Sequence, residues 1–132
     1  MKLTDLAIGD LLLINNTPHK IQAIDSIDAE ILADDELYYV GEDRCHSENK
    51  IEGIPITTEI LEKNGFIKVN SQRYDYGYPD TDCYVKVNPK KNMIHVNGRN
   101  ANSNLYSHSF VHELQRALRC CGLWCMADNF KI

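Results

Sequence analysis

The sequence lacks the long apolar run that a membrane-spanning helix needs. No run of apolar residues approaches the ~18 that a spanning helix needs, and Asp5 and Asp10 interrupt the opening stretch MKLTDLAIGDLLLI. The same stretch has no apolar core ending in small residues, which a signal peptide has. We therefore expect a cytoplasmic protein with reduced thiols and no membrane partner.

The sequence lacks an even, regularly spaced set of cysteines: its five lie at Cys45, Cys83, Cys120, Cys121 and Cys125. Secreted disulfide frameworks normally have an even number of cysteines, and the adjacent Cys120 and Cys121 bridge each other only with strain. We expect these thiols to be free and to act as small buried apolar side chains.

The signatures of several enzyme classes are also missing. The glycines are isolated from one another, which excludes a glycine-rich phosphate loop, and no Gly-x-Ser-x-Gly nucleophile elbow occurs. A thiol nucleophile would have to pair Cys45 or Cys83 with a histidine. The acidic run at Asp34, Asp35 and Glu36 is typical of a solvated face. We predict no catalytic residues, no cofactor and no enzymatic activity.

Two histidines lie four residues apart in the segment HSFVHELQRALRCCGL, which begins at His108. On a helix, His108 and His112 share one face, but the metalloprotease signature needs a histidine where Arg116 stands. We expect these histidines to cap the helix or to hydrogen-bond between the helix and a sheet.

The cysteine-rich tail offers a second metal hypothesis. Cys121 and Cys125 have the spacing of one half of a zinc site, for which Cys45 and His46 would have to supply the other half. We predict no metal site, and a small metal-dependent hydrolase is the least favoured alternative function.

The charge that is present is divided unevenly. Residues 1–66 contain five basic and fourteen acidic side chains, a formal charge of −9, whereas residues 67–132 contain nine and five, a charge of +4. The acidic half repels phosphate backbones and the basic half attracts them, although its basic residues are scattered in sequence. With 132 residues, 43% hydrophobic and 25% charged, the chain suits one domain or two small lobes.

Short apolar segments separated by turn residues fill the first part of the chain. LLLIN, HKIQAID, AEILA and ELYYVG each predict a short strand, and NNTP predicts the first turn. About five such strands predict a small SH3-like β-barrel over residues 1–55, because closure of the sheet removes exposed strand edges.

Residues 56–132 predict an α+β part that packs against the barrel in one compact unit. In EGIPITTEILEKNGF, Thr57 or Thr58 caps a short helix that Asn64-Gly65 ends, and the strand FIKVN follows. CYVKVNPKKNMIHVNG predicts an antiparallel hairpin. The polar, glycine-containing stretches 71–82 and 97–104 predict loops.

HSFVHELQRALRCCGL predicts a C-terminal helix that lies on a sheet. Its apolar residues recur at helical spacing from Phe110 to Cys121, Ser107 or Ser109 is placed to cap its start, and Gly122 is placed to end it. The helix and strand patterns together predict a core of Leu12, Ile14, Ile21, Ile24, Ile31, Leu61, Phe66, Val85, Val87, Ile94, Val96, Val111, Leu114 and Leu118.

Tyrosine and basic residues mark the candidate binding surface. In SQRYDYGYPDTD, three tyrosines alternate, so they share a face if the segment is extended. Tyrosine is favoured at recognition surfaces; base stacking beside Arg73 is one use, and packing over the sheet edge is the other. The predicted binding residues are Tyr74, Tyr76, Tyr78, Arg73, Lys90, Lys91 and Arg99, with Lys86 added for a nucleic-acid ligand.

The segments IPIT at residues 54–57, Gly65-Phe66 and VHELQ at residues 111–115 occur in a recurring order. In this the chain resembles a family of small uncharacterised proteins of Bacteroides-type genomes, often encoded by prophages or mobile elements, with PIPLT…GF and YVHELQ-like motifs. The resemblance covers most of the chain but departs near residues 42–50 and in the cysteine-rich tail. It implies an SH3-like N-terminal barrel followed by a small α+β part, and it carries over no catalytic residue.

These observations favour a non-enzymatic protein-interaction or accessory module, encoded by a mobile element, whose tyrosines and acidic face bind an unknown protein partner. The alternative is a nucleic-acid-binding protein that uses the basic C-terminal half.

Overall fold

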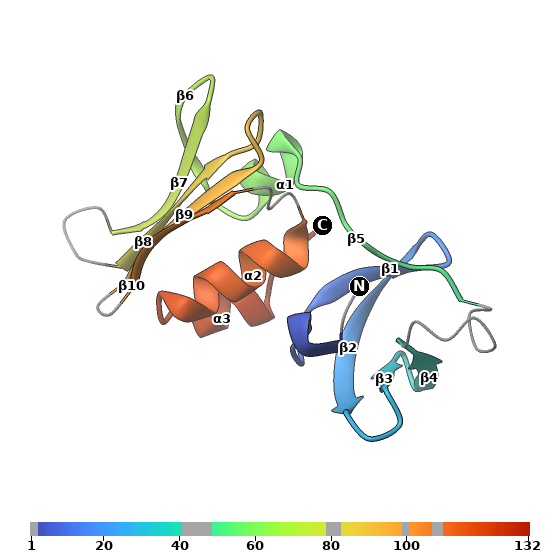
Figure 1. Cartoon of the computed structure of the whole chain (residues 1–132). Helices are drawn as coiled ribbons and strands as arrows, with labels where there is room; N and C mark the ends of the chain where they lie inside the picture. The colour runs from blue at the N-terminus through green and yellow to red at the C-terminus, as the bar shows by residue number, and fades with distance from the viewer. Residues whose placement is uncertain (1–2, 41–48, 79–82, 99–100, 107–109) are drawn as a thin grey trace. The chain divides into compact units, whose positions relative to one another are not determined.

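The structure is a computed structural model, which describes residues 3–40, 49–78, 83–98, 101–106 and 110–132 (Figure 1). The chain divides into two units, Met1–Ile54 and Pro55–Ile132. Each unit is built on an antiparallel sheet of five strands, so the predicted α+β class is confirmed. The unit boundary lies one residue from the predicted division at residue 55.

The first unit contains the 3-10 helix η1 (Leu3–Asp5) and the strands β1 (Leu11–Ile14), β2 (Thr17–Asp25), β3 (Glu30–Ala33), β4 (Glu36–Tyr39) and β5 (Ile51–Gly53). The second unit contains helix α1 (Thr58–Lys63), strands β6 (Ile67–Asn70), β7 (Arg73–Tyr78), β8 (Cys83–Asn88), β9 (Met93–Gly98) and β10 (Ala101–Tyr106), and helices α2 (Val111–Cys120) and α3 (Trp124–Asp128).

Two-residue turns with left-handed backbone create the hairpins of the first unit. Asn15 and Asn16, with φ of 51° and 66°, join β1 to β2, and Asp34 and Asp35, with φ of 49° and 63°, join β3 to β4. Positive φ at both turn residues matches the right-handed twist of paired strands, and Asn and Asp tolerate it. Asp34 and Asp35, which the sequence predicts to lie on a solvated face, therefore also form a turn.

The first sheet has the order β4-β3-β2-β1-β5. Strand β2 serves both halves of this sheet, because Thr17–Lys20 pairs with β1 and Ile21–Asp25 pairs with β3. The register shifts between Ile21 and Ala23, where an irregularity increases the local twist. Buried residues of β1, β2, β3 and β4, together with residues that follow η1 and β4, form the core of this unit. They are Leu6, Leu12, Ile14, Ile21, Ile31, Ala33, Tyr38 and Val40, with Leu3, Ile24 and Ile51 packed against them.

The second sheet is a simple meander in the order β10-β9-β8-β7-β6. The predicted loops at residues 71–82 and 97–104 were wrong in large part, because β7 and β10 lie in these stretches. Strand β7 pairs with β6 on one side and β8 on the other, and such pairing overrides a weak local preference for the strand conformation.

The predicted ends of helix α1 are confirmed. The Thr57 hydroxyl accepts a hydrogen bond from the Ile60 amide at 3.2 Å, and Gly65 follows the C-cap Asn64 with φ of 81°. The Asn64 side chain also holds the C-terminal tail, since its Nδ2 donates to the Lys131 carbonyl at 2.6 Å and its Oδ1 accepts from the Lys131 amide at 2.8 Å.

Helix α2 ends as predicted at Gly122, which has φ of 78°, but its predicted serine cap was wrong. The N-cap is Phe110, whose extended backbone forms an isolated bridge with Pro55. The Phe110 amide donates to Glu113 Oε1 at 3.3 Å, so a carboxylate in the first turn satisfies a donor at the helix start.

Helix α2 packs on β8 and β9 and against α3 (Figure 1). Every residue of the predicted core is buried except Ile24, which is half-buried. The buried Cys121 thiol donates weakly to the carbonyls of Tyr84 and Asn97, at 3.5 and 3.6 Å, and so ties the end of α2 to both strands. Gln115 Nε2 donates to the Ala127 carbonyl at 2.9 Å and joins α2 to α3.

Burial of the α2 stripe yields a stability prediction. Leu114 is completely buried, so we expect Leu114→Ala to lower the free energy of unfolding by about 2–5 kcal/mol. Arg116→Ala changes an exposed residue of the same helix and should change stability by less than about 0.5 kcal/mol. Urea unfolding followed by circular dichroism measures both; equal effects of the two variants contradict the packing described.

Candidate functional site

The strand alternation of the second sheet separates an inner and an outer face. On β8, Val85 and Val87 are buried beneath α2, whereas Lys86 between them is half-exposed. The register places Lys86 opposite Asp75 on β7 and opposite His95 on β9. Because directly opposite residues share a face, these three side chains form one polar row across the outer face.

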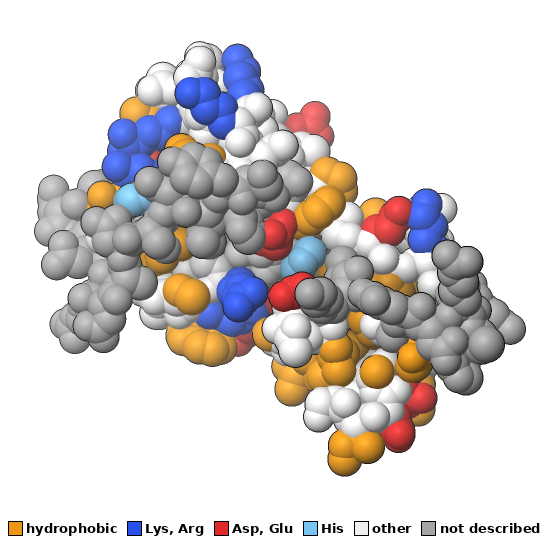
Figure 2. Space-filling model, viewed as in Figure 1, with side chains coloured by type: hydrophobic (Ala, Val, Ile, Leu, Met, Phe, Trp, Pro, Cys, Tyr) orange, Lys and Arg blue, Asp and Glu red, His pale blue; other side chains and the backbone are white. Residues whose placement is uncertain are grey.

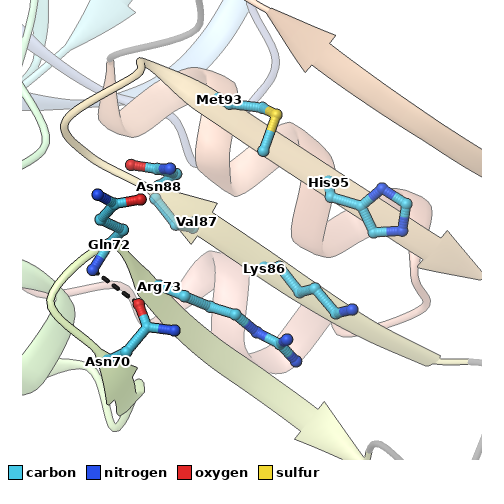
Figure 3. Close-up of a pocket in the computed structure, with 8 residues that line it drawn as sticks. All are labelled: Asn70, Gln72, Arg73, Lys86, Val87, Asn88, Met93 and His95. Carbon is cyan, nitrogen blue, oxygen red and sulfur yellow. Dashed lines mark hydrogen bonds between the residues drawn. The ribbon is translucent and has the colours of Figure 1, made fainter.

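A pocket of about 340 Å³ lies on this outer face. Its lining consists of Asn70, Gln72, Arg73, Lys86, Val87, Asn88, Met93 and His95. Figure 3 shows Arg73, Lys86, Met93 and His95 on the near side of β7, β8 and β9, with the helices behind the strands. The volume lies within the range of pockets that hold small ligands.

Arg73 is held in place by a two-point contact with Asp75. Arg73 Nε donates to Asp75 Oδ1 at 2.8 Å, and Arg73 Nη2 donates to Asp75 Oδ2 at 2.6 Å. Hydrogen bonding to Asp75 raises the pKa of Arg73 above its ordinary value, so the guanidinium is cationic at any physiological pH. Orienting the planar group in this way leaves its remaining N–H groups to face a ligand.

Lys86 is a second cation on the same face, and the Tyr84 ring holds it in place. The Lys86 ammonium lies 5.0 Å from the centre of the Tyr84 ring, within the range of a cation–π contact. The Tyr84 ring centre lies 6.4 Å from that of His95. In Figure 3 the Lys86 and Arg73 side chains extend side by side along the sheet.

Two asparagines with fixed orientation border the pocket. Asn88 Oδ1 accepts from the backbone amides of Lys90 and Lys91, both at 3.2 Å, in the turn after β8. Asn70 Oδ1 accepts from the Gln72 amide at 2.8 Å in the turn after β6. Side-chain oxygens used in this way stabilise turns. Both lone pairs of Asn88 Oδ1 are used, so Nδ2 is the polar atom that Asn88 offers a ligand, whereas Asn70 Oδ1 uses one lone pair.

The second sheet is basic where the structure describes it. Over residues 67–78, 83–98 and 101–106 there are five basic side chains, Lys68, Arg73, Lys86, Lys90 and Lys91, and one acidic side chain, Asp75. Figure 2 shows Lys and Arg side chains gathered over the region of β6 to β9. This excess of positive charge favours an anionic ligand.

The predicted binding residues are brought together only in part. Arg73 lines the pocket, and Lys90 and Lys91 lie exposed in the adjoining turn. Arg99 and the Tyr78 side chain lie outside the described residues.

Two of the predicted tyrosines face the core. The register pairs Tyr74 with Val87 and Tyr76 with Val85, so both share the inner face with these valines. Tyr74 is 3% exposed, and the Tyr76 ring centre lies 5.2 Å from that of Phe66. Tyr74 and Tyr76 do share a face, as the alternation predicts, but they pack within the unit.

Sequence reasoning did not select Asn70, Gln72, Asn88, Met93 or His95 as binding residues. Alternation along the hairpin predicts that Met93 and His95 face away from the side of the sheet on which Ile94 and Val96 lie. Burial confirms this, because Ile94 and Val96 are buried and Met93 and His95 are half-buried. The asparagines depend on turn geometry that the sequence alone does not specify.

Metal and thiol chemistry has few candidates in the part of the chain that the structure describes. Within it, no three His, Cys, Asp or Glu side chains come together as a metal site requires. Cys120 and Cys125 are exposed and Cys121 is buried. Cys45, His46 and His108 lie outside the described residues, as does the Cys83 side chain. His112 is buried, and its ring is stacked 5.9 Å from that of Phe110.

A polar cluster in the first unit has a structural role. His19 Nδ1 contacts Asp34 Oδ2, and the His19 ring lies 5.8 Å from the Tyr38 ring. The Tyr38 hydroxyl donates to Glu36 Oε2 at 2.9 Å. Each of these four side chains thus contacts another of the four, and the contacts connect β2 to the β3–β4 hairpin.

No family model, curated protein or solved structure matches this chain. None of the described helices is long and apolar enough to cross a membrane. The site is therefore interpreted from its own geometry.

The Tyr38 contact predicts a pH dependence of stability. The hydrogen bond to Glu36, followed by burial, raises the pKa of Tyr38 above the ordinary value of 10.0. A group whose pKa is higher in the folded state than in the unfolded state stabilises the fold at a pH below the unfolded-state pKa. This stabilisation is lost as the pH rises through the folded-state pKa. We expect the thermal midpoint of the wild type to exceed that of Tyr38→Phe near neutral pH, and this advantage to disappear above pH 10.0. An advantage independent of pH up to alkaline values contradicts the assignment.

Proposed function

We propose that the protein is a non-enzymatic binding protein that holds single-stranded nucleic acid on the outer face of its second sheet. The observation that carries this proposal is the pocket that Arg73, Lys86 and His95 help to line, on the face of the sheet opposite α2. Arginine and lysine are the side chains that neutralise phosphates, and this neutralisation supplies most of the affinity for nucleic acid.

A single strand suits this surface better than a duplex. Amide and cationic groups border one pocket, so a ligand with both an anionic group and a polar edge suits it. Unpaired bases in a single strand expose their hydrogen-bonding edges, whereas those of a duplex are paired. The lining residues include no carboxylate, and the neighbouring Asp75 is engaged by the Arg73 guanidinium, which supports a binding role over acid–base catalysis.

A protein partner is the second proposal, and it concerns the first unit. Residues 1–54 contain four basic and twelve acidic side chains, a formal charge of −8. Ile27 and Leu37 are 92% and 64% exposed, and exposed apolar side chains can mark a contact surface. An accessory module of a mobile element, as the sequence resemblance implies, is compatible with one unit that binds nucleic acid and another that binds a protein.

We also propose that the first unit is a small SH3-like barrel. The sheet order β4-β3-β2-β1-β5 and the sharing of β2 between β1 and β3 support it. A strand that bends at an irregularity and serves two half-sheets is the device by which small barrels turn their corners.

The nucleic-acid proposal predicts a specific salt dependence. Lys86→Gln removes one phosphate-neutralising charge, so the slope of log affinity against log salt should become less steep by about 0.7. Fluorescence anisotropy with a labelled single-stranded oligonucleotide, repeated at several salt concentrations, measures the slope.

Arg116→Gln is the matched control, because it removes the same charge from an exposed position on α2, which packs on the opposite face of the sheet. We expect it to leave the slope unchanged. Absence of binding at low salt, or equal effects of the two variants, counts against the proposed face.

A further inference from the structure

The pocket has two chemically different ends. Figure 3 shows Asn70, Gln72 and Asn88 at one end, and Arg73, Lys86 and His95 toward the other. The amide end lies where the turns after β6 and β8 approach each other, and the cationic end lies along the polar row of β7, β8 and β9. A ligand that spans the pocket therefore meets amides at one end and charge at the other.

The amide end is rich in donors, because the turns use the asparagine oxygens. Asn70 Oδ1 and Asn88 Oδ1 both accept backbone hydrogen bonds. Asn88 Oδ1 uses both of its lone pairs in this way, so Asn88 presents Nδ2 to a ligand, which only donates. Asn70 Oδ1 uses one lone pair, and Asn70 Nδ2 is its donor. Gln72, whose side-chain amide has both a donor and an acceptor, lies between them in the lining.

We propose, resting on the proposed function, that the amide end selects uracil or thymine within a single strand. These bases present two carbonyl oxygens on either side of one N–H. The two Nδ2 groups donate to the carbonyls, and Gln72 Oε1 accepts from the N–H. Met93, an adaptable apolar side chain in the lining, contacts the face of the base, and Arg73 with Lys86 binds the adjoining phosphate.

Cytosine provides a matched comparison, because it has the shape of uracil but an amino group in place of one carbonyl. That amino group would meet the Nδ2 donor of Asn88, and two donors that face each other form no hydrogen bond. We therefore expect oligo-dT to bind about tenfold more tightly than oligo-dC of the same length.

Asn88→Ser tests which side chain makes the selection. Serine retains an oxygen that can accept from the amides of Lys90 and Lys91, so the turn is preserved, but it lacks the Nδ2 donor. We expect anisotropy titrations at one salt concentration to show oligo-dT affinity falling toward that of oligo-dC, with oligo-dC affinity unchanged. Asn129→Ser, an exposed asparagine after α3, is the control and should alter neither affinity.

The outcomes separate the two proposals. Absence of binding to both oligonucleotides overturns the proposed function and this inference together. Equal binding of oligo-dT and oligo-dC leaves the proposed function standing and overturns the selection of uracil or thymine. A preference for oligo-dT that persists in Asn88→Ser with wild-type magnitude overturns the role assigned to the amide end.

Discussion

The packing of α2 on strands β8 and β9 is the constraint on which the second unit depends. Leu114 and Leu118 are fully buried in this contact, together with Val85 and Ile94 from the strands. Because side chains alternate along a strand, burying one set commits the intervening set to the other face. The same contact that stabilises the unit therefore presents Lys86 and its neighbours as an ordered polar surface. Register therefore links the core to the proposed binding face, because a slip of one residue would exchange the two faces of the sheet.

Elements with strong local signals could be predicted from the sequence. The core residues follow periodicity, and the ends of α1 and the end of α2 follow capping chemistry at Thr57, Gly65 and Gly122. The strands β7 and β10 could not be predicted in this way, because SQRYDYGY and ANSNLY lack sustained apolar alternation. They form strands because neighbouring strands provide hydrogen-bond partners along their length, and this depends on contacts made after the chain has folded.

The candidate site depended even more on tertiary structure. Arg73 and Lys86 are thirteen positions apart, and their proximity follows from the pairing of β7 with β8. The tyrosines illustrate the limit of pattern alone. Their alternation correctly predicts a shared face, but only the register with Val85 and Val87 shows that Tyr74 and Tyr76 lie on the core side. Likewise, asparagine in a sequence offers both a donor and an acceptor, and the turns determine which one remains available to a ligand.

We propose that the face of the second sheet opposite α2 binds a single strand. This can be tested by an NMR titration of isotope-labelled protein with unlabelled oligo-dT, because backbone amides report contact residue by residue. We expect the shifts to concentrate at residues 70–73, 86–88 and 93–95, with small changes along α2. Shifts that concentrate on α2 and α3, or on residues 3–40 of the first unit, would contradict it, as would a spectrum that does not change at low salt.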